Sequence, residues 1–279
     1  MEEEGRISNA EWGARNAEAE ESEKTEVFTP SFDLRNQGRR QGSLAMNATY
    51  MVLQVLFFPG LLFTGVMGLV ISWVDRKVTA RVQMRVGPPL LQPFYDIVKL
   101  MVKETCVPAG GSKLLFLSAP LVSVSVVALA STILWRTVFT PNQAFVGDII
   151  VVLYLLTMPA LAVVLGSFAS RNPLASLGGS REMKLIMAYE LPFVLAVLVP
   201  VIKTHSIQFG VILSEPAAVG SLSGILALVV AILCMQAKLT LVPFDAPEAE
   251  TELAGGAYIE YSGPPLGMFK LSRAMMLFT

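Results

Sequence analysis

Five long apolar stretches, separated by short polar segments, dominate the pattern of hydrophobic and polar positions along the chain. A helix needs about 20 apolar residues to cross the hydrocarbon core of a bilayer, and each stretch has or approaches that length. The expected spans are about 50–74, 114–135, 148–168, 185–202 and 221–242, with a partial span at 266–279 where the sequence stops. The pattern predicts an all-α, polytopic transmembrane helix bundle whose chain ends within the sixth span. Either the chain is truncated or a separate chain supplies the last helices.

A short amphipathic helix is expected after the first span, within the sequence RVGPPLLQPFYDIVKLMVKE. The GPP sequence at 87–89 interrupts the chain, and Pro93 suits the first turn of a new helix. Apolar residues then recur at helical spacing, at Phe94, Ile97, Val98 and Met101. Such a helix lies at the membrane surface. It is either an ordinary interfacial anchor or a platform for a partner protein.

Composition supports a membrane protein with a polar N-terminal extension. The chain is 53% hydrophobic and 15% charged, with a mean hydropathy of +0.59, whereas soluble domains carry about 25% charged residues. Residues 1–45 are rich in Glu, Ala, Ser and Asn and predict a disordered tail, which leaves 46–279 for the bundle. Cys106 and Cys234 lie far apart without a histidine nearby, so no metal or disulfide framework is expected.

The distribution of Lys and Arg predicts the orientation of the spans. Seven basic residues lie between the first two spans and three between the third and fourth, whereas the two opposite loops hold one each. Because basic loops face the cytoplasm, these loops and the segment after the fifth span are expected on the cytoplasmic side. The chain is therefore predicted to be a multi-pass protein of the inner (cytoplasmic) membrane.

The segment after the fifth span, LTLVPFDAPEAETELAGGAYIEYSGPP, is unusually acidic. Two prolines at 243 and 247 stop the helix, and no Lys or Arg lies between residues 245 and 260, so the negative charges stand unopposed. Its carboxylates are Asp245, Glu248, Glu250, Glu252 and Glu260. This segment is either a solvated loop or a site that attracts cations and protons. As a site, it would also dock basic groups from a partner or from the first cytoplasmic loop.

Two charged residues lie inside expected spans. Glu190 follows Lys184 by six residues, and Lys238 precedes Asp245 by seven, so both lie about 9 Å or more into their helices. Adjacent antiparallel helices could bring Glu190 and Lys238 together. Ionisable groups within the membrane are functional candidates, and a carboxyl balanced between burial and a nearby cation can take up and release protons. The alternatives are a static pair that fixes packing, or a Lys238 that reaches toward the interface.

Three motifs together resemble one family. RVGPPLLQPFYDIVKLMVKE, REMKLIMAYELP and PFDAPEAETELAGGAYIEYSGPPLGMFKL are similar to the membrane subunit that couples the peripheral and membrane arms of respiratory NADH:quinone oxidoreductase, the NADH dehydrogenase subunit 1 family. The family includes counterparts in energy-converting nickel–iron hydrogenases and formate hydrogenlyase. The resemblance covers about residue 73 to the end. It implies an eight-helix bundle, of which this sequence holds five helices and a fraction.

The resemblance implies a charged, hydrated path from a redox-side cavity into the membrane. The positions of that path are Glu190, Asp245, Glu248, Glu250, Glu252 and Glu260, to which we add Lys238. The interface with the peripheral arm would be formed by Arg85, Gln92, Asp96 and Lys99. The implied partners are iron–sulfur and catalytic subunits, antiporter-like membrane subunits and membrane lipid, with no nucleic acid. Iron–sulfur clusters and a nickel–iron centre would belong to those partners, and none to this non-catalytic chain.

The compact sequence GPPLLQP favours the hydrogenase-like branch, because quinone-reducing members usually carry an additional Gly-containing insertion there. The resulting hypothesis is a subunit that couples a partner's redox reaction to the translocation of protons or sodium ions. The alternatives are a quinone-binding subunit of NADH:quinone oxidoreductase and a passive membrane anchor of a soluble reductase. An independent secondary transporter is disfavoured, because such proteins contain inverted repeats and the sequence shows none.

Overall fold

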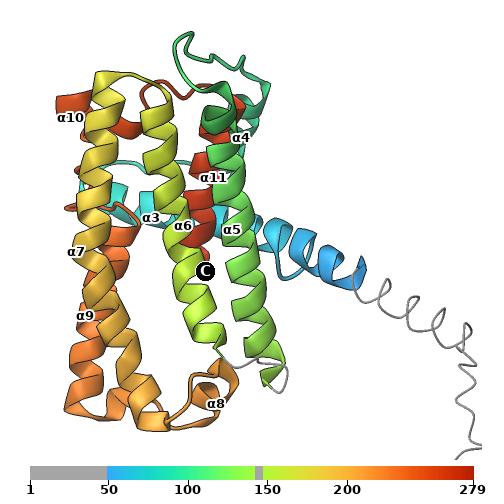
Figure 1. The fold of residues 1–279 in the computed structure, drawn as a ribbon, viewed down its shortest axis with the longest axis vertical. Helices are drawn as coiled ribbons and strands as arrows, with labels where there is room; N and C mark the ends of the chain where they lie inside the picture. Colours follow the sequence, from blue (N-terminus) through green and yellow to red (C-terminus); the bar gives the residue numbers. More distant parts are fainter. Residues whose placement is uncertain (1–48, 142–146) are drawn as a thin grey trace, which may run out of the picture. The chain divides into compact units, whose positions relative to one another are not determined.

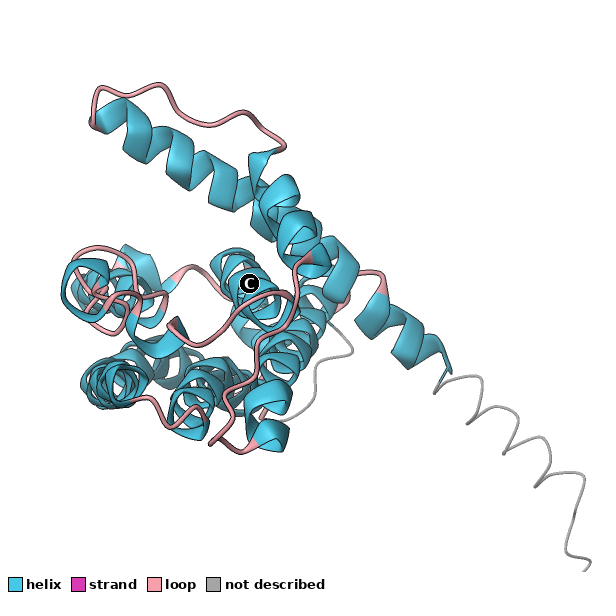
Figure 2. Cartoon of the chain, turned by 90° about the horizontal axis from the view of Figure 1, so that it is seen from above, coloured by secondary structure: helices cyan, strands magenta, loops and turns pink. Residues whose placement is uncertain are grey.

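The computed structural model describes residues 49–141 and 147–279. The disordered tail predicted at 1–45 lies outside these ranges. The described residues form α-helices, short 3-10 turns and loops, with no strand among them (Figure 2). The prediction of an all-α polytopic bundle is therefore confirmed.

Six principal helices follow one another along the chain (Figure 1). They are α3 (Leu61–Val82), α5 (Lys113–Phe139), α6 (Asp148–Ala169), α7 (Pro173–Thr204), α9 (Leu222–Lys238) and α11 (Pro264–Phe278). Shorter helices lie between them: α4 (Gln92–Val102), α8 (Phe209–Ser214) and α10 (Glu250–Leu253). Four helices of the described residues are long and apolar enough to cross a membrane: Thr49–Val82, α5, α6 and α7. The apolar helix α9 is shorter.

Local sequence signals explain where several helices begin and end. Helix α7 begins at Pro173, well before the expected residue 185, because Asn172 caps it by accepting a hydrogen bond from the backbone N–H of Leu174. Helix α9 ends at Lys238 instead of residue 242, since the backbone turns at Thr240, whose φ is +48°. The first span is helical over residues 51–56 and interrupted at 57–60 before α3 begins.

Neighbouring helices pack in a chain of pairs. Helix α5 lies along α6, α6 along α7, and α7 along α9 (Figure 1). Helix α11 packs against α3 and α5, and so occupies the interior of the described bundle. Small residues line several of these contacts, as is typical of membrane helix pairs. Among the buried ones are Ala119 and Ala128 of α5 and Ala160 and Ala162 of α6.

The segment between α9 and α11 folds back into the bundle, and Tyr261 anchors it there. The Tyr261 ring stacks on Phe116 of α5, with centroids 4.1 Å apart, and its hydroxyl donates a hydrogen bond of 3.1 Å to the Phe116 carbonyl. Gly166 of α6 makes room, because a Cβ at this position would collide with the Tyr261 hydroxyl. Burial raises the pKa of Tyr261, so the hydroxyl stays protonated and continues to donate.

The short helix α4 packs against α3 and α11. Leu100 and Met101 lie next to Gly267 of α11, whereas Tyr95 and Val98 are 61% and 60% exposed. The predicted amphipathic helix is therefore present, with one side against the bundle and another open.

Candidate functional site

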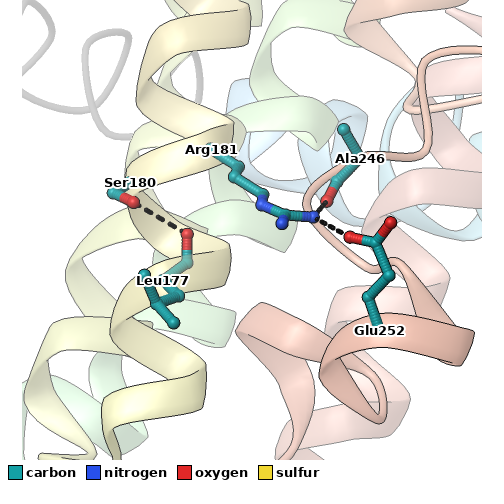
Figure 3. Close-up of polar contacts among 5 residues, drawn as sticks. All are labelled: Leu177, Ser180, Arg181, Ala246 and Glu252. Atoms are coloured by element: carbon teal, nitrogen blue, oxygen red, sulfur yellow. Dashed lines mark hydrogen bonds and ion pairs between the residues drawn. The ribbon is translucent and has the colours of Figure 1, made fainter.

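The carboxylates of the acidic segment meet basic and amide groups that come from distant parts of the chain. Arg181 of α7 makes an ion pair of 2.8 Å with Glu252 and donates a hydrogen bond of 3.3 Å to the Ala246 carbonyl (Figure 3). The Asn172 side chain donates a hydrogen bond of 2.5 Å to Glu260. The segment is thus held against the start of α7.

Glu248 forms the most enclosed of these pairs, with Arg273 of α11. Arg273 also donates a hydrogen bond of 2.8 Å to the carbonyl of Thr240, in the turn after α9. The expectation that the carboxylates stand unopposed is therefore wrong for Glu248, Glu252 and Glu260. Their partners are 25 to 88 residues away in sequence, and none of these partners comes from the first cytoplasmic loop. Asp245 is exposed, and the Glu250 side chain lies outside the described part of the structure.

Glu182 is a buried carboxyl that sequence reasoning did not select. It lies on α7, is 4% exposed and lines a small cavity together with Lys238, Tyr258 and Arg273. In sequence it stands between Arg181 and Lys184, which is typical of a solvated helix face. Its presence in the REMK motif was the available signal.

Glu190 and Lys238 lie on adjacent helices, as expected, but they do not form an ion pair among the described residues. The Lys238 ammonium lies 4.9 Å from the centroid of the Phe193 ring and 5.9 Å from that of Tyr189. Glu190 instead lines an apolar groove of about 640 Å³ between α6 and α7, next to Leu153. The cause is helical geometry, because one residue step turns a side chain by about 100°, so Tyr189 and Glu190 face different neighbours.

The four residues expected at the peripheral-arm interface divide into two kinds. Asp96 makes an ion pair of 2.9 Å with Arg76 of α3 and accepts a hydrogen bond of 3.0 Å from Gln92. Partial burial pushes the pKa of Asp96 up, but these two hydrogen bonds and the charge of Arg76 outweigh it and lower the pKa below its usual value. Arg85 and Lys99 are exposed. Asp96 and Gln92 therefore fasten α4 to α3, while Arg85 and Lys99 are available to a partner.

Arg273 stands where the cavities of this region meet. It lines the inner cavity with Glu182, an outer cavity of about 280 Å³ with Lys270, and another of about 550 Å³ with Asp245. The Arg273–Glu248 pair therefore separates buried ionisable groups from the rim of the acidic segment. Such an arrangement can pass or hold protons. Within the described residues, no group of three or more His, Cys, Asp or Glu side chains could hold a metal ion.

The fold and the site define a multi-pass helical membrane protein with a charged cluster at one end of its bundle. The family model of NADH dehydrogenase matches residues 53–279. An H-type subunit of NADH-quinone oxidoreductase from Solibacter usitatus is 33% identical over 234 residues, which cover 75% of this chain and 58% of that protein. The corresponding H-type protein from Brevibacillus brevis is 34% identical over 216 residues, covering 74% and 63%. The chain belongs to the NADH dehydrogenase family, which confirms the resemblance noted in the sequence.

A solved structure also resembles the fold. It is the archaeal membrane-bound sulfane sulfur reductase, a respiratory membrane complex, with a TM-score of 0.73 and 27% identity over 81% of this chain and 75% of that chain. The present chain spans less than two thirds of the length of the curated relatives it matches.

Proposed function

We propose that this chain is a membrane subunit of a multisubunit, ion-translocating redox complex of the inner membrane, similar to membrane-bound hydrogenases. It would hold the peripheral electron-transfer arm through the face that carries Arg85 and Lys99. Its own role would be coupling: events at a partner's redox site change protonation at Glu190 and in the acidic segment, and those changes bias antiporter-like neighbours toward moving protons or sodium ions. Iron–sulfur clusters and a nickel–iron centre would reside in the partner subunits.

One observation carries this proposal: ionisable groups are gathered inside the bundle, directly beneath the acidic segment. Glu182 and Lys238 are almost fully buried, and the Arg273–Glu248 pair lies beside them. Burying such groups in a membrane protein costs several kcal/mol, and an anchor has no need of them. A relay of protonatable groups between the surface and the membrane interior does need them.

The test is the substitution Glu190→Gln in the intact complex, with ion translocation and redox turnover measured in vesicles. We expect translocation to fall at least tenfold while the subunits still assemble and the redox reaction continues, because glutamine cannot exchange a proton. The control is Glu215→Gln, on the exposed turn after α8, which should translocate like the wild type. If both variants translocate normally, this chain is a passive anchor.

A second candidate is a quinone-binding subunit, favoured by the similarity to subunits of NADH-quinone oxidoreductase. The similarity to a sulfane sulfur reductase, together with the compact GPPLLQP sequence, favours the first proposal. Quinone that co-purifies with the complex, or inhibition by quinone-site inhibitors, would support the second candidate instead.

A further inference from the structure

The inner cavity of the bundle is small, enclosed and bordered by charge. Its volume is about 40 Å³. Four helices contribute polar groups to it: Ser123 from α5, Glu182 from α7, Lys238 from the end of α9, and Ser272 and Arg273 from α11. The two serine hydroxyls bond each other at 2.7 Å. Tyr258 and Thr240 complete the polar lining.

The two oppositely charged groups in this cavity face it without touching. Lys238 is 8% exposed and Glu182 is 4% exposed, yet no ion pair within 4.0 Å joins them in the described structure. The Lys238 ammonium is buried and has no hydrogen-bond partner there. The nearby Phe193 and Tyr189 rings stabilise a cation by about 1–2 kcal/mol, which does not replace the lost hydration of an ammonium. A further acceptor is therefore required.

The cavity has the size and chemistry for water to be that acceptor. A bound water needs about 10–15 Å³ of cavity volume and two to four polar partners, so the cavity has room for about three. Purely apolar cavities of this size stay dry, but this one offers a carboxylate, an ammonium, a guanidinium and several hydroxyls. Water in such a site can accept from Lys238 and donate to Glu182.

We propose that ordered water fills this cavity and joins Lys238 to Glu182, so that the two side chains exchange a proton. In one direction the proton leaves the Lys238 ammonium, crosses the water and binds a carboxylate oxygen of Glu182. The charged pair then becomes a neutral amine and a neutral acid, and the net charge of the cavity is unchanged. The two groups titrate as a unit. The idea that this exchange serves ion translocation rests on the proposed function, whereas the exchange itself does not.

The surroundings couple this proton to both ends of the region. Glu182 interacts electrostatically with Glu248 and Arg273, which form the ion pair at the acidic segment. Lys238 interacts with Glu190 on the neighbouring helix. A change at the Arg273–Glu248 pair, such as docking of a partner, would therefore shift the preferred position of the proton. This makes Glu182 a member of the relay that the acidic loop alone does not predict.

The experiment is infrared difference spectroscopy of the purified complex during a pH titration, with water exchanged for deuterated water. We expect a carboxylic-acid band from Glu182 that disappears in Glu182→Gln and shifts in Lys238→Met, because the methionine cannot share the proton. Two further variants test the water without touching either charge. Ser272→Val should fill the cavity and weaken the band at least twofold, whereas Ser272→Ala leaves the space open and should keep it.

The proposal is overturned if Glu182→Gln leaves the spectrum unchanged, or if Ser272→Val and Ser272→Ala both keep a wild-type band. The two serine variants decide the question even where Lys238→Met fails to assemble. Failure of the proposed function has a different signature. If Glu190→Gln translocates normally while the Glu182 band still depends on the cavity, the proton exchange stands and its role in coupling falls.

Discussion

Arg273 is the side chain on which the charged cluster most depends. Its guanidinium pairs with Glu248, bonds the Thr240 carbonyl, and lines the inner and outer cavities at once. It therefore connects α11 to the turn after α9 and to the acidic segment. Removing one member of an enclosed ion pair leaves the other charge without compensation, which costs more than the pair contributes.

We predict that Arg273→Met lowers the free energy of unfolding by about 2 kcal/mol, less than the roughly 3–5 kcal/mol of a fully buried pair because both side chains keep some solvent access. Thermal unfolding of the purified protein in detergent measures this. Lys270→Met is the control, since Lys270 lies on the same helix, is exposed and has no ion pair in the described structure. The double variant with Glu248→Gln should recover part of the loss. Equal stability of the two single variants would contradict the prediction.

At the scale of elements, the contact between α7 and the returning acidic segment depends on Gly178. A Cβ there would collide with the backbone of Ala257, Gly256 and Pro247. These backbone atoms belong to a segment that Tyr261 fixes from the other side. The segment therefore cannot move aside to accept a methyl group.

We predict that Gly178→Ala destabilises the protein by about 1–3 kcal/mol through this overpacking, although alanine is the better helix former by about 1 kcal/mol. The matched control is Gly65→Ala in α3, where the nearest atom to an added Cβ is Leu271 Cδ1 at 3.7 Å. The control should be neutral or stabilising. Detergent unfolding of both variants is the measurement, and a Gly178→Ala protein as stable as Gly65→Ala would refute the close approach.

The attachment of α4 to α3 should depend on acid pH. The pKa of Asp96 is lower in the folded protein than in an unfolded chain, so its pair with Arg76 stabilises the attachment at all pH values above about 4. This contribution is lost as the pH falls through the folded pKa. We predict that residues 92–102 lose hydrogen-exchange protection, corrected for intrinsic rates, below about pH 4. In Asp96→Asn the protection should already be lower at pH 7 and change little on acidification.

At the scale of the whole molecule, the chain acts through its partners if the proposal is right. We predict that the affinity-purified complex contains iron–sulfur subunits, and that its nickel content decides between the two candidates. Nickel at about one atom per copy of this chain indicates the hydrogenase branch, whereas a flavin-bearing NADH module indicates the quinone branch. Purification of this chain without any redox subunit from gently solubilised membranes would contradict both.

Much of this molecule follows from local patterns in the sequence. Apolar stretches, prolines and the spacing of Phe94, Ile97 and Met101 predict where helices lie and that a short helix follows the first span, because hydropathy and periodicity are properties of neighbouring residues. The order of three motifs also predicts the family. Boundaries were less predictable: α7 extends back to Pro173 because Asn172 caps it, although charged residues fill its first turns.

The site was decided by packing between segments that are far apart in the chain. The sequence by itself determined that this is a membrane helix bundle with a cluster of acids after one span. It did not reveal that Arg181 and Arg273 reach those acids, that Glu182 shares a cavity with Lys238, or that Glu190 faces α6 instead. Only the tertiary structure decides these contacts, because one residue step turns a helical side chain by about 100° and the rotation of each helix is fixed by the neighbours it packs against.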